Sequence, residues 1–178
     1  MRIISGTFKG KHIDVPSSFK ARPTTDFAKE SLFNILNNVY IDFEQAPTAL
    51  DLFAGTGSIS LEFLSRGCGR VVSVEKDFKQ WQFLVKTAKM LKNMAWKPVH
   101  ADVFKFINKV EEKFDIVFAD PPYALKNLAD IPSLVFEADI LQKDGLFILE
   151  HGKDYDFTKH DRFTEHRKYG SVNFSFFK

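Results

Sequence analysis

The sequence predicts an α/β fold in which a mostly parallel sheet ends in an antiparallel hairpin. From residue 49 onward, short apolar runs alternate with segments of helical periodicity, which is typical of βαβ units. The last two predicted strands, 162–169 and 171–177, are separated only by Gly170 and must therefore pair antiparallel. With 178 residues and 44% hydrophobic side chains, the chain is large enough for one core.

The first residues are expected to form a small β-hairpin. Residues 2–5 and 12–15 flank a turn with two glycines, which can supply positive φ angles. Lys9 and Lys11 would lie at the tip of this hairpin.

A polar connector, residues 16–23, then leads to a helix that Thr24 or Thr25 can cap. We therefore predict two parts: an N-terminal hairpin and helix extension over residues 1–40, and the sheet domain over residues 41–178.

The remaining elements follow from apolar periodicity. The predicted helix over residues 77–91 is expected to carry Phe78, Trp81, Leu84 or Val85, and Ala88 on one apolar face. Strands are predicted at residues 49–53, 70–75, 97–100, 114–119 and 145–150 before the final hairpin, and helices at 58–64, 77–91, 103–108 and about 131–136. A parallel sheet finished by an antiparallel hairpin is the layout of a class I methyltransferase (Rossmann-like), rather than of a dinucleotide dehydrogenase.

Composition argues against several classes of protein. No apolar run approaches the ~20 residues that span a bilayer, and no signal-peptide segment precedes the first strand. Cys68 is the single cysteine, and the five histidines show no metal-ligand spacing. We therefore expect a cytoplasmic protein without a metal and without contact to a membrane.

Positive charge is concentrated at the N-terminus. Residues 1–30 hold six Lys/Arg against three acids, a net charge of +3. The other 148 residues hold 19 against 20, a net charge of −1. This distribution suits an edge that binds a polyanion, although chance clustering on a solvated surface explains it equally well.

The segment D-L-F-A-G-T-G, residues 51–57, has the context of a nucleotide-binding glycine loop. It follows the first predicted strand and precedes a helix, and Gly55 and Gly57 permit a tight turn close to a ligand. Ser60 stands where a dinucleotide motif has its third glycine. The alternative is a tight turn between strand and helix that binds nothing.

Four acids end four successive predicted strands: Asp51, Glu75, Asp102 and Asp120. In an open α/β sheet this edge is where ligands bind. Glu75 is placed to accept both hydroxyls of an adenosine ribose. Asp102 can accept from an adenine amine while the Val103 N–H meets a ring nitrogen. Each acid taken singly is equally a solvated strand end or a helix cap.

The same acids discriminate between cofactors. Four carboxylates would repel a pyrophosphate, whereas they attract the sulfonium and ammonium groups of S-adenosylmethionine. A methyltransferase is therefore favoured over a dehydrogenase.

The segment D-P-P-Y, residues 120–123, follows a strand expected to be buried on both faces. Pro121 and Pro122 stop the strand in a stiff corner. The Asp120 carboxylate and the Pro121 carbonyl are acceptors beside the flat ring of Tyr123. This arrangement suits a planar substrate with an exocyclic amine, and the alternative is an ordinary Pro-Pro turn.

Together these segments resemble one family. D-L-F-A-G-T-G, V-V-S-V-E, A-D-V and A-D-P-P-Y occur in order, with R-I-I-S-G-T-F-K-G-K and R-P-T-T-D-F-A-K-E-S-L-F before them and K-Y-G-S-V-N-F-S-F-F after them. Nearly the whole chain is similar to the RsmD-type small-subunit (16S) ribosomal RNA guanine-N2 methyltransferases. The resemblance implies transfer of methyl from S-adenosylmethionine to a flipped guanine of small-subunit rRNA, within the assembled or assembling subunit.

The resemblance also assigns roles to residues. Lys29 departs from the family pattern, which has an arginine there, and lysine cannot form a bidentate fork. The implied catalytic residues are Asp120, Pro121, Pro122 and Tyr123; the cofactor-binding residues are Asp51, Phe53, Gly55, Thr56, Gly57, Glu75, Asp102 and Val103; the RNA-binding residues are Arg2, Lys9, Lys11, Arg22, Thr24 and Lys29.

Two alternatives remain. An adenine-N6 DNA or RNA methyltransferase shares D-P-P-Y, but 21 residues between Tyr123 and Gly145 are too few for an added target-recognition segment. A non-catalytic ribosome-assembly factor on the same fold would be expected to have degraded motifs, and here all four are intact.

Overall fold

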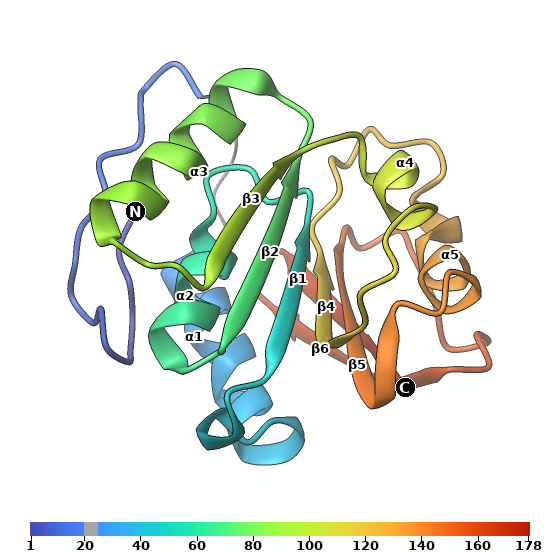
Figure 1. Cartoon of the computed structure of the whole chain (residues 1–178). Coiled ribbons are helices and arrows are strands. Elements are labelled where there is room, and N and C mark those ends of the chain that lie inside the picture. Colours follow the sequence, from blue (N-terminus) through green and yellow to red (C-terminus); the bar gives the residue numbers. More distant parts are fainter. Residues whose placement is uncertain (20–24) are drawn as a thin grey trace.

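The computed structural model describes residues 1–19 and 25–178, and it contains one seven-stranded sheet between two layers of helices (Figure 1). The strand order is β3-β2-β1-β4-β5-β7-β6. The strands are β1 (Thr48–Leu52), β2 (Arg70–Glu75), β3 (Trp96–His100), β4 (Phe114–Ala119), β5 (Leu141–His151), β6 (Phe163–Tyr169) and β7 (Val172–Phe177). The α-helices are α1 (Asp26–Ile35), α2 (Ser58–Arg66), α3 (Phe78–Leu91), α4 (Val103–Ile107) and α5 (Ile131–Glu137).

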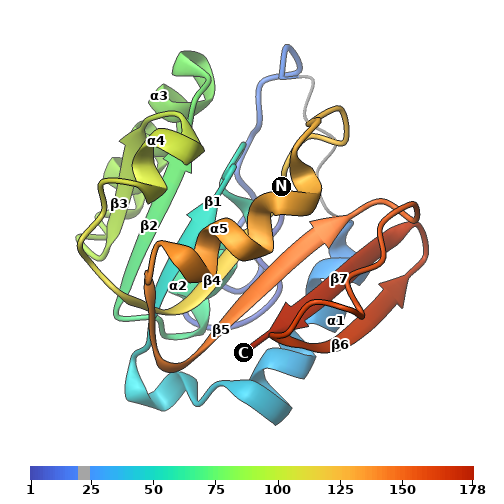
Figure 2. The same ribbon diagram turned by 90° about the vertical axis from the view of Figure 1, so that its right-hand side faces the viewer.

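The pairing of the strands confirms the predicted architecture. β1 to β5 pair in parallel, whereas β7 pairs antiparallel with both β5 and β6. The β6–β7 hairpin extends the sheet at the edge opposite to β3 (Figure 2). The carboxyl ends of the five parallel strands therefore share one edge of the sheet.

Each parallel strand contributes to two cores, because successive side chains point to opposite faces. In β4, Ile116 and Phe118 belong to the core beneath α1, α2 and α3. Val117 and Ala119 belong to the core beneath α4 and α5. Figure 2 shows α5 in front of the sheet and α1 behind it.

Several local predictions need correction. The strand predicted at 145–150 begins earlier, since β5 already pairs with β4 at Leu141 across an irregular register. A π-helical turn (Leu36–Tyr40) and two 3-10 turns (Phe43–Gln45 and Leu128–Asp130) were not foreseen.

Helix α3 faces the core with a different stripe from the predicted one. Leu84, Thr87 and Ala88 are its buried residues. Phe78, by contrast, is 52% exposed, and Trp81 is only half-buried. The aromatic side chains at the start of α3 therefore lie at the surface.

The N-terminal hairpin is present, although its arms are too irregular to form named strands. The Ile3 N–H donates to the Lys11 carbonyl at 3.1 Å, and the Ile13 N–H donates to the Met1 carbonyl at 2.9 Å. Arg2 and His12 form a single isolated bridge. The N–H groups of Ile4 and Ser5 donate to the buried carboxylate of Glu62 in α2, at 2.9 and 3.0 Å. Residues 1–15, which we call the N-terminal strap, thus form an irregular hairpin that is also fastened to a helix.

The strap packs closely on the end of α2. Gly6 has φ +81°, and a Cβ atom there would lie 1.7 Å from the carbonyl oxygen of Ser65. The N–H groups of Thr7 and Phe8 donate to the carbonyl and hydroxyl oxygens of Ser65, at 2.7 and 2.9 Å. The turn of the strap is therefore anchored to the backbone and side chain of Ser65.

Helix α1 begins as predicted. The Thr25 side chain caps it by accepting from the Ala28 N–H at 3.2 Å, while Thr24 lies outside the described residues. Ile3 of the strap and Leu32 of α1 belong to the same core as the sheet. A domain boundary between residues 40 and 41 stays a prediction.

Candidate active site

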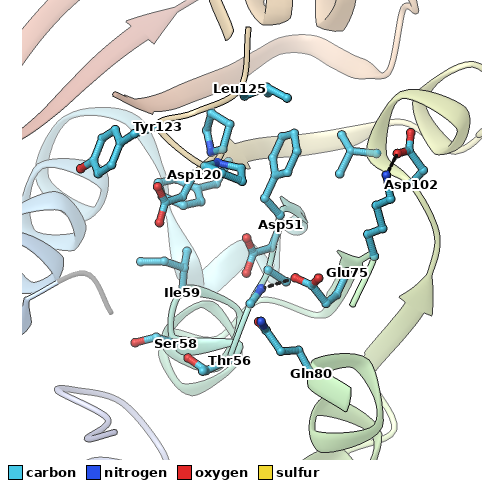
Figure 3. Close-up of a pocket in the computed structure, with 18 of the residues that line it drawn as sticks. Asp51, Thr56, Ser58, Ile59, Glu75, Gln80, Asp102, Asp120, Tyr123 and Leu125 are labelled. Carbon is cyan, nitrogen blue, oxygen red and sulfur yellow. Dashed lines mark hydrogen bonds and ion pairs between the residues drawn. The ribbon is translucent and has the colours of Figure 1, made fainter. Parts of the chain in front are cut away.

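A cavity of about 580 Å³ opens at the carboxyl edge of the parallel strands (Figure 3). The glycine loop after β1, the ends of β2 and β4, and the start of α4 all contribute to it. It gathers all four predicted catalytic residues and every predicted cofactor-binding residue except Gly57. Sequence reasoning did not anticipate Ala54, Ser58, Ile59, Lys76, Gln80, Phe104, Phe118 and Leu125, which complete the lining.

The glycine loop turns through left-handed backbone conformations. Phe53, Gly55 and Gly57 have φ angles of +62°, +55° and +78°. A Cβ atom on Gly57 would lie 2.6 Å from Cδ2 of Leu84. Gly57 therefore lets α3 approach the loop, and it acts behind the cavity wall rather than in it.

Glu75 is held at the end of β2 by two backbone groups. One carboxylate oxygen accepts from the Gly55 N–H at 2.8 Å, the contact drawn as a dashed line in Figure 3. The other accepts from the Asp77 N–H at 2.7 Å. These bonds fix the carboxylate in an orientation against the glycine loop.

Asp51 ends a chain of hydrogen bonds that runs through the core. Its carboxylate accepts from both the N–H and the hydroxyl of Ser60. The Ser60 and Ser73 hydroxyls are 2.6 Å apart, and the Trp96 indole donates to Ser73 at 2.7 Å. An indole N–H can only donate, so the Ser73 hydroxyl accepts from Trp96. The Ser73 hydroxyl then donates to the Ser60 hydroxyl, which donates to Asp51. Ser60, the departure from the third glycine, thus has a structural role.

Burial governs the charge of Asp51. Desolvation raises the pKa of its carboxyl to about 7, although the Ser60 hydrogen bonds oppose this shift. The nearby Asp120 charge raises the pKa further.

Asp102 is stabilised in its ionised form. It caps α4 by accepting from the N–H groups of Phe104 and Lys105, at 3.1 and 3.3 Å. Its other oxygen pairs with the Lys76 ammonium at 2.9 Å (Figure 3). The hydrogen bond from Lys76 is the main reason that the pKa of Asp102 is lowered.

The D-P-P-Y corner forms the opposite end of the cavity (Figure 3). Pro121 is buried, whereas Tyr123 is 55% exposed. The Tyr123 ring lies beside Gly152, where an added Cβ atom would be 3.6 Å from the ring. A flat, accessible aromatic face therefore borders the carboxylate of Asp120.

Asp120 has a carboxylate neighbour that sequence analysis missed. Ala119 pairs with Leu149 in the β4–β5 ladder, so the next positions on the two strands, Asp120 and Glu150, are adjacent. Glu150 is 4% exposed. Burial, followed by the charge of Glu150, raises the pKa of Asp120 well above its ordinary value. The sequence did contain a signal for Glu150, because this acid ends the fifth predicted parallel strand, 145–150.

The predicted RNA-binding residues fall into three groups: exposed, outside the described residues, and buried. Arg2, Lys9 and Lys11 are exposed; Arg2 pairs with Asp26 at 3.1 Å, and the Lys11 ammonium lies over the Phe8 ring at 4.9 Å. Arg22 and Thr24 lie outside the described residues.

The prediction that Lys29 contacts RNA is corrected. Lys29 is 1% exposed, and its ammonium donates to the Arg2 carbonyl at 2.7 Å and to the Ser58 hydroxyl at 3.1 Å. Glu62 lies 3.9 Å away. Desolvation is the main cause that lowers the Lys29 pKa. Lys29 instead joins the strap, α1 and the start of α2.

Two kinds of feature are absent from the described residues, 1–19 and 25–178. No helix there is both long enough and apolar enough to cross a membrane. No group of three or more His, Cys, Asp or Glu side chains is placed there to hold a metal ion.

Comparison with known proteins identifies the family. The family described as Conserved hypothetical protein 95 matches residues 1–178. The chain belongs to this family. The Ribosomal RNA small subunit methyltransferase D of Escherichia coli (strain K12) is 34% identical over 150 residues, which are 84% of this chain and 74% of that protein. The Bacillus subtilis (strain 168) protein YlbH, whose name assigns it provisionally to the rRNA methyltransferases, is 36% identical over 88% of this chain and 85% of its own length. The predicted membership of the RsmD-type family is confirmed.

Comparison with solved structures confirms the fold. A Thermus thermophilus protein, TTHA0928, superposes with a TM-score of 0.87 at 28% identity, covering 100% of this chain and 99% of that one. The Escherichia coli protein yhhF, provisionally described as a methyltransferase, gives a TM-score of 0.85 at 29% identity, covering 99% and 96%. The class I methyltransferase architecture predicted from the sequence is thus correct.

Proposed function

We propose that this chain transfers a methyl group from S-adenosylmethionine to the exocyclic N2 amine of a guanine in small-subunit ribosomal RNA. The observation that carries the proposal is that the acid-lined glycine loop and the D-P-P-Y corner line the same cavity. The ribosomal substrate is supported by the name of the Escherichia coli relative, at 34% identity.

The cofactor fits the Glu75–Asp102 end of the cavity. The volume of about 580 Å³ lies in the usual range for small-molecule sites. Glu75, fixed by two backbone N–H groups, retains lone pairs that can accept ribose hydroxyls. Val103 is the first residue of α4, so its N–H has no acceptor within the helix. That N–H and the Asp102 carboxylate form a donor and acceptor pair for an adenine edge.

The acidic lining also matches the charge of the ligand. Asp51, Glu75, Asp102 and Asp120 all border the cavity. When bound, S-adenosylmethionine supplies an activated methyl group on a positively charged sulfonium. Carboxylates in a partly desolvated cavity favour such a cation and disfavour a pyrophosphate.

Asp120 and Tyr123 would handle the methyl acceptor. The guanine N2 lone pair is delocalised into the ring, so the amine needs an acceptor for its hydrogens. The Asp120 carboxylate would accept a hydrogen bond from one N–H of the amine, and the Pro121 carbonyl would accept one from the other. This favours a tetrahedral nitrogen whose lone pair is free to react. A raised pKa makes the Asp120 carboxylate a stronger base. Tyr123 stacks on the flipped base, a contact worth ~1–3 kcal/mol.

The N-terminal strap is proposed to dock the RNA through Arg2, Lys9 and Lys11, together with Arg22 and Thr24. Lys9 and Lys11 are exposed beside the turn of the strap. Each phosphate contact contributes to the salt dependence of binding, so Lys9→Ala/Lys11→Ala should reduce that slope by up to about two units. Titration of RNA across a salt series measures it. An unchanged slope would place the docking surface elsewhere.

The activity is tested with radiolabelled S-adenosylmethionine and three acceptors: intact small ribosomal subunits, their extracted RNA, and duplex DNA. We expect label in the subunits, and N2-methylguanosine after nuclease digestion. N6-methyladenosine, or label in DNA, would establish the adenine-specific alternative. Cofactor binding without any transfer would establish the non-catalytic assembly factor.

A further inference from the structure

A second basic segment lies outside the N-terminal strap. Residues 76–97 hold six lysines against the single acid Asp77, a net charge of +5. Outside this segment and residues 1–30, the chain carries a net charge of −6. The near-neutral total for residues 31–178 therefore conceals a strongly basic stretch, which covers α3 and the start of β3.

These lysines are displayed to solvent. All six are exposed. Lys76 pairs with Asp102, but in residues 1–19 and 25–178 no ion pair involves the other five. The lysines are Lys76, Lys79, Lys86, Lys89, Lys92 and Lys97.

Aromatic rings lie at the surface beside these lysines: Phe78 and His100 are exposed, and Trp81 is half-buried. Trp81 of α3 stacks on His100 of β3, with ring centroids 5.2 Å apart and planes 27° apart. Phe78 lies 5.6 Å from Trp81 and 5.5 Å from His100. The Trp81 indole N–H donates to the Pro98 carbonyl at 3.4 Å. Since β3 is an edge strand, these rings form a platform that neighbouring strands do not cover.

The platform borders a depression and leads to the active site. Trp81, Val85, Lys86 and Lys89 line a hollow of about 370 Å³ beside the rings. At the start of the segment, Lys76 lines the cavity itself. The face therefore runs from the rim of the cavity along α3.

The chain just after the strap contacts the same helix. Phe19, just after the strap, packs edge-on against Phe83 of α3, with centroids 5.6 Å apart. Figure 1 shows the N-terminal segment, in blue, beside α3. The two basic parts of the chain are thus neighbours, although about 60 residues separate them in the sequence.

We propose that this α3–β3 face binds a single-stranded segment of RNA that flanks the methylated nucleotide. Lysines would contact phosphates while Trp81 provides the surface for a base, the combination typical of sequence-tolerant single-strand binding. An acidic protein would match the lysines but would leave the ring platform without a partner. This inference rests on the proposed function, because it names a second contact surface for the same RNA.

The first test compares two double variants with the same change of charge. Lys86→Ala/Lys89→Ala alters the proposed face. Lys143→Ala/Lys168→Ala removes two exposed lysines from β5 and β6, at the far side of the sheet. With RNA extracted from small ribosomal subunits as the probe, the first pair should lower the salt slope by about 1.4 units and weaken binding severalfold. The second pair should leave both unchanged.

The second test uses tryptophan fluorescence. The chain has two tryptophans, and Trp96 is 5% exposed with its N–H bonded in the core. RNA should therefore quench Trp81, and the quenching should vanish in Trp81→Phe. Trp81→Leu should weaken RNA binding by roughly 5- to 150-fold, the range expected for loss of one stacked base. Thermal melting verifies that each variant is folded.

Three outcomes would overturn this surface: equal salt slopes for the two double variants, quenching that persists in Trp81→Phe, or polyglutamate binding as tightly as RNA. The last outcome would assign the face to an acidic protein. Failure of the proposed function is distinguishable, since it appears as absence of methyl transfer by the wild type. If the wild type is inactive but binds RNA through these lysines, the proposed RNA-binding surface stands and the proposed methyl transfer is wrong.

Discussion

The two ends of the cavity use carboxylates in opposite ways. At one end, Glu75 and Asp102 accept hydrogen bonds from backbone N–H groups, and Lys76 adds a cation to Asp102. At the other end, burial and the charge of Glu150 raise the pKa of Asp120, and burial also raises the pKa of Asp51, which lies between Glu75 and Asp120 (Figure 3). Asp102 and Asp120 lie on opposite sides of the view in Figure 3.

This difference separates binding from chemistry. A carboxylate surrounded by donors is held in one orientation, as binding a ribose or an adenine edge requires. A desolvated carboxylate near another acid is a better base but is protonated more readily. Substitutions at the two ends should therefore change different measured quantities.

The largest expected effect is that of Asp120→Asn. The amide keeps the shape but cannot act as a base, so the rate of methyl transfer should fall by about 10²- to 10⁴-fold. Single-turnover incorporation of label measures the rate. Cofactor affinity, measured by calorimetry, should change little. Near-normal transfer would reduce the D-P-P-Y corner to an ordinary turn.

Glu75→Ala should change the affinity for the cofactor. The loss of charge-assisted hydrogen bonds, each worth ~1.5–3 kcal/mol, should weaken S-adenosylmethionine binding at least about tenfold. Calorimetric titration measures this affinity. Exposed Glu111 offers a control, since Glu111→Ala removes the same charge away from the cavity. Equal affinities for the two variants would remove Glu75 from the ribose site.

The dependence of transfer on pH should sharpen the comparison. Because the Asp120 pKa is raised, transfer should be lost as pH falls through a value above the ordinary carboxyl range. Glu150→Gln removes one cause of the raised pKa and should move this loss toward lower pH. The pH profile of kcat/KM measures both. A profile that does not move would show that the Glu150 charge does not act on the reacting carboxylate.

The smallest effect is expected for Lys76→Ala. The Lys76 side chain is 76% exposed, and exposed ion pairs contribute ~0.2–1 kcal/mol. Cofactor affinity should therefore fall less than about fivefold, and added salt should diminish the difference. A loss comparable to that of Glu75→Ala would mean that Lys76 contacts the ligand itself.

Local sequence patterns predicted the elements that depend on local features. β2 and β4 have the predicted bounds because each is a short, mostly apolar run between polar residues. The acids at strand ends converge because parallel strands align their carboxyl ends. The start of β5 was missed because Gln142, Lys143 and Asp144 interrupt the apolar pattern.

Features that depend on distant partners were not visible in the sequence. Lys29 looks like a surface cation, and only the fold brings the Arg2 carbonyl and Ser58 to its ammonium. Periodicity assigned Phe78 and Trp81 to the core, but their stripe lies at the edge of the sheet, where no further strand covers them. Net charge summed over 148 residues likewise hid the basic α3 face.

The Glu62 contacts have a consequence for the order of folding. The hydrogen bonds from Ile4 and Ser5 to Glu62 join residues 58 and 57 positions apart. These two hydrogen bonds therefore form only once α2 is in place, whereas those between residues 1–3 and 10–13 are local to the strap. During local opening of the native protein, the strap can detach while the central strands stay paired, as a separate cooperative unit. The amide hydrogens of Ile4 and Ser5 should consequently exchange with solvent together, and well before those of β1 and β4.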